Sequence, residues 1–412
     1  MKSKWPIKRL SEVAEIEMGQ SPKGSSYNTS GEGVPLINGP VEFGKTPFSR
    51  TKKTKFTTEP TKICKVGDLI LCVRGSTTGR MNIAGYESCI GRGVASIRSE
   101  KYQDWINFFI HTNRETIYRL GSGATFPNVS GSMLAKLEIP IPPETEQKRL
   151  VAIVDEAFEG IDRAIANTKK NRTNARELFE SYLNTILSGQ GKQWKETTLG
   201  KEIDLLTGFA FKSSGYTDSD KSIRLLRGDN IIPGSLRWDG VKRWQESKVN
   251  EYLRYQLQEG DVVLAMDRPW IKTGLRRAQI SKDDLPCLLV QRTACLRGGD
   301  NLENRFLLYL ISGRAFTQHV LGSQTGLSVP HISGTQIQSF KFSKPSLREQ
   351  YSIIDSLDEL KSETKRLEAI YQRKLAALKE LKQSILRKAF TGELIAKTTH
   401  QTIKAAKETI AA

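Results

Sequence analysis

The chain has 412 residues, too many for one ordinary core, and its 38% hydrophobic and 26% charged residues are typical of a soluble globular protein with two or more domains. It lacks an apolar run near the roughly 18 residues of a transmembrane helix, and no secretion-signal stretch follows its first residues, so we expect a cytoplasmic protein without a membrane partner. The formal net charge of +18 favours a polyanion such as nucleic acid, with general solubility as the alternative explanation.

The sequence contains an internal repeat, which predicts two related halves. The first matches lie 189 residues apart (194 − 5), and the offset rises in small steps to 203 (350 − 147) towards the end of each half. Small steps are expected where loops differ in length while the scaffold is kept. Matched pairs include Trp5 and Trp194, Leu10 and Leu199, Lys23 and Lys212, Asp68 and Asp261, Arg98 and Arg297, and Gln147 and Gln350.

Each half begins with a globular part whose short β-type runs are separated by Gly and Pro. These runs are VPLI, DLILCV and VASI in the first half and SIRLLRG, DVVLAM and TACLR in the second. We expect one helix near 104–120 and its counterpart near 303–321. Each is followed by a Gly/Ser/Pro loop, a further strand and a long helix.

The two long helices are predicted at 144–190 and 347–394, where apolar residues recur at alternating steps of three and four. About 40 helical residues make a rod of roughly 60 Å, which needs a partner helix to cover its apolar stripe. Heptads more often indicate oligomerisation, but two equal helices in one chain equally favour an antiparallel intramolecular pair. The expected seam residues are Leu150, Val154, Ile161, Leu178 and Tyr182 in the first helix and Leu357, Leu360, Leu367, Tyr371, Leu378, Leu381 and Ile385 in the second.

The predicted fold class is α+β, with two tandem α+β globules, each followed by a long helix, and the two helices paired as an antiparallel coiled coil with pseudo-twofold symmetry. The segments are a first globule at 1–143, a helical region at 144–190, a second globule at 191–346, a second helical region at 347–395 and a C-terminal tail at 396–412. The five cysteines have no CxxC spacing and stand in apolar runs, so we expect buried, reduced thiols.

No catalytic motif is recognisable in the sequence. GSTTGR at 75–80 lacks the spacing and the Lys of a phosphate-binding loop. The sequence DRPW at 267–270 superficially resembles the motif of amino-group methyltransferases, but Arg stands where that motif has Pro. The four histidines do not have metal-ligand spacing. We therefore expect this chain to contain no catalytic residue, no metal site and no cofactor.

Basic residues gather in Gly-containing loops at related places in the two halves, where their side chains can reach phosphates and base edges. An ordinary solvated charge is the alternative for any single residue. In the first half the candidate DNA-binding residues are Lys23, Asn38, Lys52, Lys53, Lys55, Arg74, Arg80 and Arg92, with Asn128 as a further base reader. In the second half they are Lys212, Arg227, Arg268, Trp270, Lys272, Arg276, Arg277, Arg292 and His331, with Gln324 as a further base reader.

Together these features resemble the specificity (S) subunit of type I restriction–modification systems, over nearly the whole chain. The resemblance rests on the tandem organisation of globule and helix and on the helix openings TEQKRLVAIVDE and REQYSIIDSLDE. It rests further on the helix endings ILSGQ and AFTGEL, the loops NVSG and HISG, and the runs GDLIL and GDVVL.

The resemblance implies that the globules are target-recognition domains, each reading one half of a split double-stranded DNA sequence, and that the paired helices set the gap between the half-sites. It also implies docking of modification (methyltransferase) subunits, two in number, and of restriction (translocase and nuclease) subunits. S-adenosylmethionine, ATP and Mg are then expected in those partner subunits. The alternatives are a self-contained DNA methyltransferase or nuclease with an unfamiliar site, and a coiled-coil scaffold that binds DNA without sequence preference.

Overall fold

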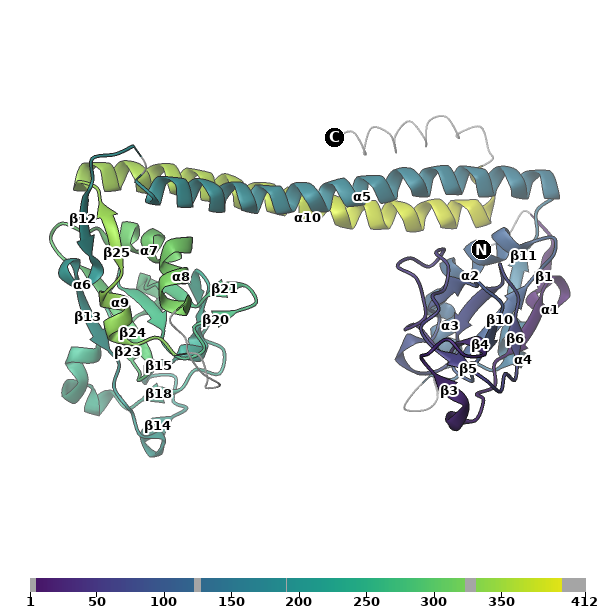
Figure 1. Cartoon of the computed structure of the whole chain (residues 1–412), viewed down its shortest axis with the longest axis horizontal. Coiled ribbons are helices and arrows are strands. Elements are labelled where there is room, and N and C mark those ends of the chain that lie inside the picture. Colours follow the sequence, from purple (N-terminus) through teal and green to yellow (C-terminus); the bar gives the residue numbers. More distant parts are fainter. Residues whose placement is uncertain (1–4, 122–126, 190, 323–330, 395–412) are drawn as a thin grey trace. The chain divides into compact units, whose positions relative to one another are not determined.

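The structure, a computed structural model, describes residues 5–121, 127–189, 191–322 and 331–394; the predicted tail at 396–412 and Gln324 lie outside them. The chain divides into two compact units, Met1–Lys169 with Gln372–Ala412, and Lys170–Tyr371. Two long helices, α5 (Glu144–Leu187) and α10 (Leu347–Thr391), contribute residues to both units (Figure 1). Among the described residues, no helix combines the length and apolar character needed to cross a membrane.

The globule of the first unit is built from short strands and four short α-helices. Its strands are β1 (Ile7–Arg9), β2 (Glu15–Met18), β3 (Tyr27–Asn28), β4 (Val34–Ile37), β5 (Phe56–Thr57), β6 (Ile63–Cys64), β7 (Leu69–Cys72), β8 (Met81–Ile83), β9 (Ser88–Ile90), β10 (Val94–Arg98) and β11 (Glu138–Pro140). Its helices are α1 (Leu10–Val13), α2 (Gln103–Thr112), α3 (Arg114–Leu120) and α4 (Gly131–Ala135), with 3-10 turns η1 (Gly24–Ser26) and η2 (Gly75–Thr77).

The globule of the second unit has the same kinds of element and several additional short ones. Its strands are β12 (Lys195–Thr198), β13 (Ile203–Thr207), β14 (Tyr216–Thr217), β15 (Ile223–Leu226), β16 (Ile231–Ile232), β17 (Ser235–Leu236), β18 (Arg243–Trp244), β19 (Val262–Ala265), β20 (Trp270–Ile271), β21 (Gly274–Leu275), β22 (Arg277–Gln279), β23 (Cys287–Leu289), β24 (Thr293–Gly298) and β25 (Lys341–Lys344). Its helices are α6 (Leu199–Glu202), α7 (Asn304–Ser312), α8 (Arg314–Gly322) and α9 (Gly334–Gln338), with 3-10 segments η3 (Ser213–Gly215), η4 (Gly228–Asn230), η5 (Glu246–Tyr255) and η6 (Lys282–Asp284).

The predicted repeat is visible in the sheet topology. The order β2-β10-β7-β8 in the first unit corresponds to β13-β24-β19-β22 in the second, and all neighbours in these two sheets are antiparallel. A second sheet in each unit contains one parallel pair, β4 with β9 and β15 with β23. The α+β class and the two tandem domains predicted from the sequence are therefore confirmed.

Both faces of the central strands are buried, which explains why they read as continuous apolar runs rather than alternating ones. In β7, Leu69 and Leu71 face the helices of the first unit, whereas Ile70 and Cys72 pack in the cluster that includes the second sheet. β19 alternates in the same way between two clusters. All five cysteines are buried and reduced, and burial raises the pKa of the Cys72 thiol to about 11.

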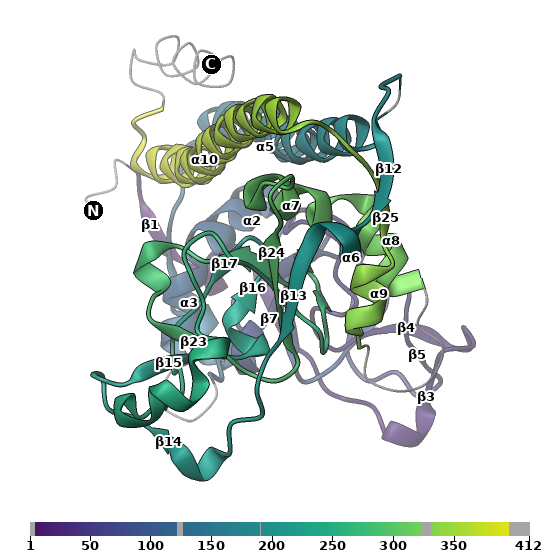
Figure 2. The ribbon, with the colours of Figure 1, turned by 90° about the vertical axis from the view of Figure 1, so that its left-hand side faces the viewer.

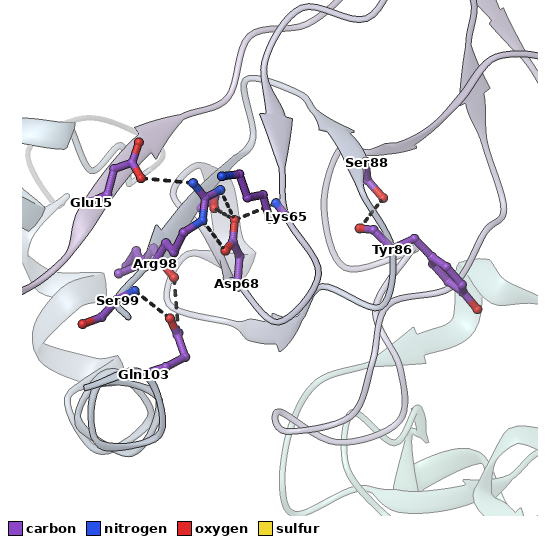
Figure 3. Close-up of polar contacts among 10 residues, drawn as sticks. Glu15, Lys65, Asp68, Tyr86, Ser88, Arg98, Ser99 and Gln103 are labelled. Carbon is purple, nitrogen blue, oxygen red and sulfur yellow. Dashed lines mark hydrogen bonds and ion pairs between the residues drawn. The ribbon is translucent and has the colours of Figure 1, made fainter. Parts of the chain in front are cut away.

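A buried carboxylate stands just before β7 in the first unit and just before β19 in the second. Asp68 accepts hydrogen bonds from Nε and Nη2 of Arg98 at 2.8 and 2.7 Å (Figure 3). Asp261 accepts from the same atoms of Arg297 at 2.6 and 2.8 Å. Each Asp is 2% exposed. The Gly-Asp motif of the sequence therefore marks a bidentate ion pair inside each scaffold.

The openings of the two long helices explain the matched Glu-Gln pairs. Glu146 accepts a hydrogen bond from the indole of Trp5 at 2.8 Å, and Glu349 accepts one from Trp194 at 3.1 Å. The residue after each glutamate is a buried glutamine whose side chain bonds to the segment just before the helix. Gln147 donates to the carbonyl of Pro142 at 2.8 Å. Gln350 donates to the carbonyl of Pro345 at 3.0 Å in the second unit. Each globule is thus tied to the helix that follows it.

In the first unit, the beginning of α5 pairs with the end of α10. Lys382 donates to both carboxylate oxygens of Asp162 at 2.8 and 2.9 Å and lies 4.2 Å from the ring centroid of Phe158. The ring of Phe390 lies 4.4 Å from that of Trp105 in α2. Residues from near the end of the chain therefore complete the core of the globule that begins it.

In the second unit, the end of α5 pairs with the beginning of α10, and Figure 2 shows α7 between these helices and the sheet. Leu183 and Leu357 form a cluster with Tyr309 of α7. The hydroxyl of Tyr309 donates to Asp358 at 2.5 Å, and Arg305 forms an ion pair with the same carboxylate at 2.8 Å. Arg176 of α5 forms an ion pair with Glu368 of α10. Because Leu183, later in α5, packs with Leu357, earlier in α10, the two helices run antiparallel within this unit.

Two of the twelve expected seam residues do not lie in a seam. Leu178 is 61% exposed and Tyr182 is 40% exposed, whereas Leu183 is buried and Phe179 half-buried. The predicted heptad was extended with a step of three after Ala175, but the helix continues with steps of four. Leu150, Val154, Ile161, Leu357, Leu378 and Ile385 are buried, and Leu360, Leu367, Tyr371 and Leu381 are half-buried.

Each single helix predicted after the central strands is in fact two helices. α2 ends at Thr112 and α3 begins at Arg114. Between them the backbone of Asn113 is not helical, and its side chain donates to the carbonyl of Phe109 at 2.9 Å. α7 and α8 are separated at Gly313, whose extended backbone ends the first helix. Apolar periodicity continues across both breaks, so it could not reveal them.

Candidate nucleic-acid interface

Four chain segments of the first globule meet beyond one end of β7, and we call them the first loop junction (37–39, 73–75, 91–93 and 127–129). Backbone hydrogen bonds tie them together: the N–H of Gly91 donates to Ile37 at 2.9 Å, and that of Val73 donates to Gly93 at 2.9 Å. The N–H of Val129 donates to Val73 at 2.8 Å. A fixed backbone therefore supports side chains that come from four distant parts of the sequence.

The second globule has an equivalent second loop junction (226–228, 266–268, 290–292 and 331–332). The N–H of Val290 donates to Leu226 at 3.1 Å and that of Met266 to Arg292 at 2.9 Å. The N–H of Ile332 donates to Met266 at 2.7 Å. The repeat thus places the candidate DNA-binding loops of both halves on the same framework.

The first loop junction presents basic and amide side chains. Arg74 and Arg92 are exposed, and Arg74 pairs as an isolated β-bridge with the exposed Asn128. Asn38 is half-buried and borders a hollow of about 390 Å³ that Lys55 also lines. Guanidinium and amide groups of this kind can donate to guanine or pair with adenine in the major groove.

Other candidates of the first globule lie outside the first loop junction. Lys53 lies 4.1 Å from the ring centroid of Tyr86, and Lys23 forms an exposed ion pair with Glu59 at 3.8 Å. Arg80 lines a separate hollow of about 160 Å³ together with His111. Burial, with the neighbouring charges of Lys382 and Arg114, lowers the pKa of His111 to about 4, so this ring is neutral at pH 7.

In the second loop junction, one carboxylate holds two of the predicted residues. Asp267 accepts from Nη1 of Arg292 at 2.5 Å and faces Nδ1 of His331 at 2.5 Å. Although burial acts to raise it, the bonds from His331 and Arg292 hold the pKa of Asp267 below its ordinary value. The sequence pattern does not reveal Asp267 as a functional candidate, since DRPW resembles only a catalytic motif.

The predicted DNA contact is wrong for Arg276, because its side chain is used inside the protein. Arg276 is 7% exposed and donates to the backbone carbonyls of Ile231 and Gly228, the first at 3.0 Å. It thereby fixes the η4 loop to the strands. Arg277 is also held internally, by Ser312 Oγ at 2.5 Å and the carbonyl of Leu275 at 3.2 Å. Burial lowers the pKa of Arg277 to about 10.

A cleft of about 940 Å³ lies within the second unit, between the end of α5 and the β20–β21 hairpin. Trp270 lines it and is 49% exposed, and Lys272 is exposed on the same hairpin. Neither residue belongs to the second loop junction. Arg227 is half-buried and forms an ion pair with Asp229 at 3.7 Å. The exposed candidates of both globules are Lys23, Lys52, Lys53, Arg74, Arg80, Arg92, Asn128, Lys212, Arg268, Trp270, Lys272, Arg292 and His331.

No group of three His, Cys, Asp or Glu side chains is placed to hold a metal ion in the described part of the chain. Each loop junction presents exposed hydrogen-bond donors on chain segments that backbone hydrogen bonds hold together. Such a surface suits the positioning contacts to phosphates and the base contacts that protein–DNA recognition combines.

Comparison with known proteins identifies this architecture. The sequence model of the family described as Type I restriction modification DNA specificity domain matches residues 2–174 and 192–376, once in each half. The type I restriction enzyme EcoAI specificity subunit of Escherichia coli is 38% identical over 168 residues, which are 40% of this chain and 28% of that subunit. The type I restriction enzyme MjaVIII specificity subunit of Methanocaldococcus jannaschii is 23% identical over 346 residues, 81% of this chain and 80% of that subunit.

The fold has a counterpart among solved structures. A chain in a structure concerning the complex assembly and conformational transition of the type I R-M system has a TM-score of 0.76 at 19% identity, over 95% of this chain and 98% of that chain. A likeness at this identity shows a shared fold. Together with the family match in both halves, it leads to one conclusion: the chain belongs to the family of type I restriction modification DNA specificity domains and carries two copies of that domain.

Proposed function

We propose that this chain reads a two-part double-stranded DNA target, one part with each globule, as the specificity subunit of a type I restriction–modification complex. The observation that carries the proposal is the repeated loop junction. The two junctions stand on equivalent strands, yet the side chains they present differ.

The two half-sites should therefore have unlike sequences. The first junction offers Arg74, Arg92 and Asn128, which suit guanine and adenine edges. The second offers Arg292 and His331 held by a carboxylate. Exposed lysines elsewhere on each globule can neutralise phosphates and fix the orientation of the duplex without reading its sequence.

We assign the catalytic steps to partner subunits. In this proposal α5 and α10 dock two modification subunits, which bind S-adenosylmethionine and methylate adenine, while restriction subunits supply ATP- and Mg-dependent translocation and cleavage. The charged outer faces of both helices support a docking role, since residues such as Lys169, Lys170 and Lys379 are exposed there. The chain itself then needs no active site.

The test is footprinting of the full chain assembled with a modification subunit on a DNA library. We expect protection of two short tracts separated by a constant gap, and methylation of adenine within them. Continuous protection, or the absence of any sequence preference, would contradict the proposal and support a non-specific DNA-binding scaffold. Methyl transfer or DNA cleavage by the chain alone would support the self-contained enzyme instead.

A second experiment tests whether the helices set the gap. One heptad inserted into α5 and one into α10, opposite each other, adds about 10 Å of helix while keeping the apolar repeat. We expect the gap in the methylated motif to grow by about three base pairs, at 3.4 Å each, with both half-sites unchanged. An unchanged gap in an assembled, active complex would show that the helices do not measure distance.

A further inference from the structure

Three segments of the second globule place Asp267, Arg292 and His331 side by side. Asp267 follows β19, Arg292 precedes β24 and His331 precedes α9. The two oxygens of the carboxylate face different partners, Oδ2 facing Nη1 of Arg292 and Oδ1 facing Nδ1 of His331, each at 2.5 Å. One anionic group thus connects two candidate DNA-reading side chains.

Exposure separates the roles of the three residues. The side chain of Asp267 is 23% exposed, whereas those of Arg292 and His331 are 70% and 50% exposed. The carboxylate is therefore the most shielded of the three groups, whereas a ligand can reach the guanidinium of Arg292 and the imidazole of His331. The bonds from His331 and Arg292, acting against burial, keep Asp267 ionised.

The backbone beneath this group adopts an unusual conformation. Arg268 and Arg292 have φ of +43° and +64°, the left-handed region that costs a non-glycine residue roughly 1–2 kcal/mol. Both positions correspond to glycines of the first globule. Thr293 pairs with Ala265 in the same way that Val94 pairs with Cys72. Arg292, which precedes Thr293, is therefore equivalent to Gly93, which precedes Val94. By the 193-residue offset (261 − 68), Arg268 stands where the first globule has Gly75, whose φ is +76°.

Two arginines therefore occupy positions of this junction where the first globule has glycine. Strain retained at a surface site is characteristic of positions kept for function. Asp267 itself replaces Arg74, the equivalent residue of the first loop junction by the same offset. The first junction thus has Arg74 at the position where the second junction has the carboxylate that pairs with Arg292.

We propose that Asp267 is a positioning residue that fixes Arg292 to read one guanine in the second half-site. The ion pair uses Nη1, and the guanidinium carries further N–H donors that match the O6 and N7 acceptors of guanine in the major groove. In the neutral form of His331, the tautomer that donates from Nδ1 to the carboxylate leaves Nε2 as an acceptor for an exocyclic amino group of a neighbouring base. This inference rests on the proposed function.

The experiment uses the full chain assembled with its modification subunit. The methylated motif is mapped in the DNA of a host that carries the wild-type chain, Asp267→Asn or Arg292→Lys. Lysine keeps the charge but lacks the two-donor fork of arginine. Asp220→Asn is the matched control, since Asp220 also pairs with an arginine of the same globule, Arg243, at 3.5 Å but outside the second loop junction.

We expect Asp267→Asn and Arg292→Lys to relax the same single position of the same half-site, with the preference for guanine falling about tenfold. The other half-site and the gap should be unchanged, and Asp220→Asn should keep the motif intact. A purely structural role for Asp267 would instead lower methylation at all sequences equally.

A uniform loss, an unchanged motif, or relaxation at two different positions would each overturn the inference while leaving a two-part motif and the proposed function in place. If Asp267→Asn prevents folding, Arg292→Lys decides alone, because its exposed side chain contributes little to the core. A wild-type complex that methylates no two-part motif would refute the proposed function instead.

Discussion

The two halves of this chain share the same buried polar contacts but differ in the side chains at their surfaces. The bidentate pair of Asp68 with Arg98 recurs as Asp261 with Arg297, at distances of 2.6 to 2.8 Å in both. At the loop junctions, however, an arginine in one half corresponds to a carboxylate in the other. Buried pairs are constrained by desolvation, whereas exposed loops can vary without loss of the scaffold.

A second difference lies where each globule meets its helices. In the second unit, Asp358 of α10 receives Tyr309 and Arg305 from α7. At the equivalent place in the first unit, burial and then the nearby Asp104 raise the pKa of Asp155. The first unit relies there on aromatic contacts instead, with Phe158 and Phe108 at 5.8 Å between ring centroids. Equivalent helix contacts can thus be polar in one unit and apolar in the other.

The largest expected effect tests the shared scaffold. Asp68→Asn and Asp261→Asn each remove the buried carboxylate of a bidentate ion pair, so we expect either variant to lower the free energy of unfolding of its own unit by about 3 kcal/mol. Hydrogen exchange resolved along the chain under mild denaturant measures each unit separately. Asp220→Asn, in an exposed pair, should change little. Unequal losses in the two units would show that the scaffolds are less alike than their contacts.

The next prediction concerns the helix seam of the second unit. Leu183→Ala should cost about 3 kcal/mol in free energy of unfolding because the side chain is 4% exposed and packs with Tyr309 and Leu357. Leu178→Ala should cost no more than about 0.5 kcal/mol, since that leucine is 61% exposed. Thermal and urea unfolding of both variants provides the measurement. The reverse order of costs would restore the register predicted from the heptad pattern.

Acid should weaken the first unit more than the second. The pKa of His111 is lowered to about 4 in the folded state from its ordinary 6.5, and the residue at the equivalent place in the second unit is Ser312. Between pH 6.5 and 4, His111 is therefore protonated in the unfolded chain but neutral in the folded chain. Stability is full above pH 6.5 and falls as the pH drops through this window, by about 1–2 kcal/mol at pH 5.

The free energy of unfolding of the first unit is measured by hydrogen exchange at pH 7 and pH 5, in the wild-type chain and in His111→Ser. The variant should lose most of the pH dependence and resemble the second unit. An equal acid sensitivity of variant and wild type would assign the effect to carboxylates elsewhere in the unit.

The smallest expected effect concerns DNA affinity. Arg92 is exposed in the first loop junction, and Gln291 occupies the equivalent place in the second by the 199-residue offset (297 − 98). Arg92→Gln should therefore weaken binding to the first half-site by about three- to tenfold without affecting the second. Lys8→Gln, on β1 away from the junction, is the control.

Binding of the assembled complex to DNA at several salt concentrations distinguishes two roles of Arg92. A phosphate contact would lower the salt slope by about one and affect all sequences alike. A base contact would leave the slope nearly unchanged and relax one position. An effect on the second half-site would break the assignment of one globule to one half of the target.

Much of the fold was predictable because its signals are local or repeated. The central strands, both long helices and the two-domain organisation follow from apolar runs, heptads and a repeat that differs only in loop length. The break at Asn113 was not predictable, since the apolar periodicity continues across it and only the backbone of that one residue leaves the helical conformation. The seam at Leu183 was also not predictable, because after Ala175 a step of three to Leu178 fits a heptad as well as the step of four to Phe179 that the helix uses.

The candidate site was predictable only as a set of loops. Basic composition indicated Arg92 and Arg292 but equally indicated Arg276, which is buried against the carbonyls of Ile231 and Gly228. Whether an arginine points outward or supports a loop depends on distant backbone. Asp267 was missed for the same reason: its two partners lie 25 and 64 residues further along the chain.

The joining of the first globule to the end of α10 has a consequence for biosynthesis. The second unit is one continuous stretch, Lys170–Tyr371, and can fold as soon as it leaves the ribosome. The first unit needs Lys382, 220 residues after Asp162, together with the leucines around it. At a synthesis rate of about 5–20 residues per second, the stretch from Asp162 to Lys382 takes on the order of 10 to 40 s to make. The globule that is synthesised first therefore completes its core last.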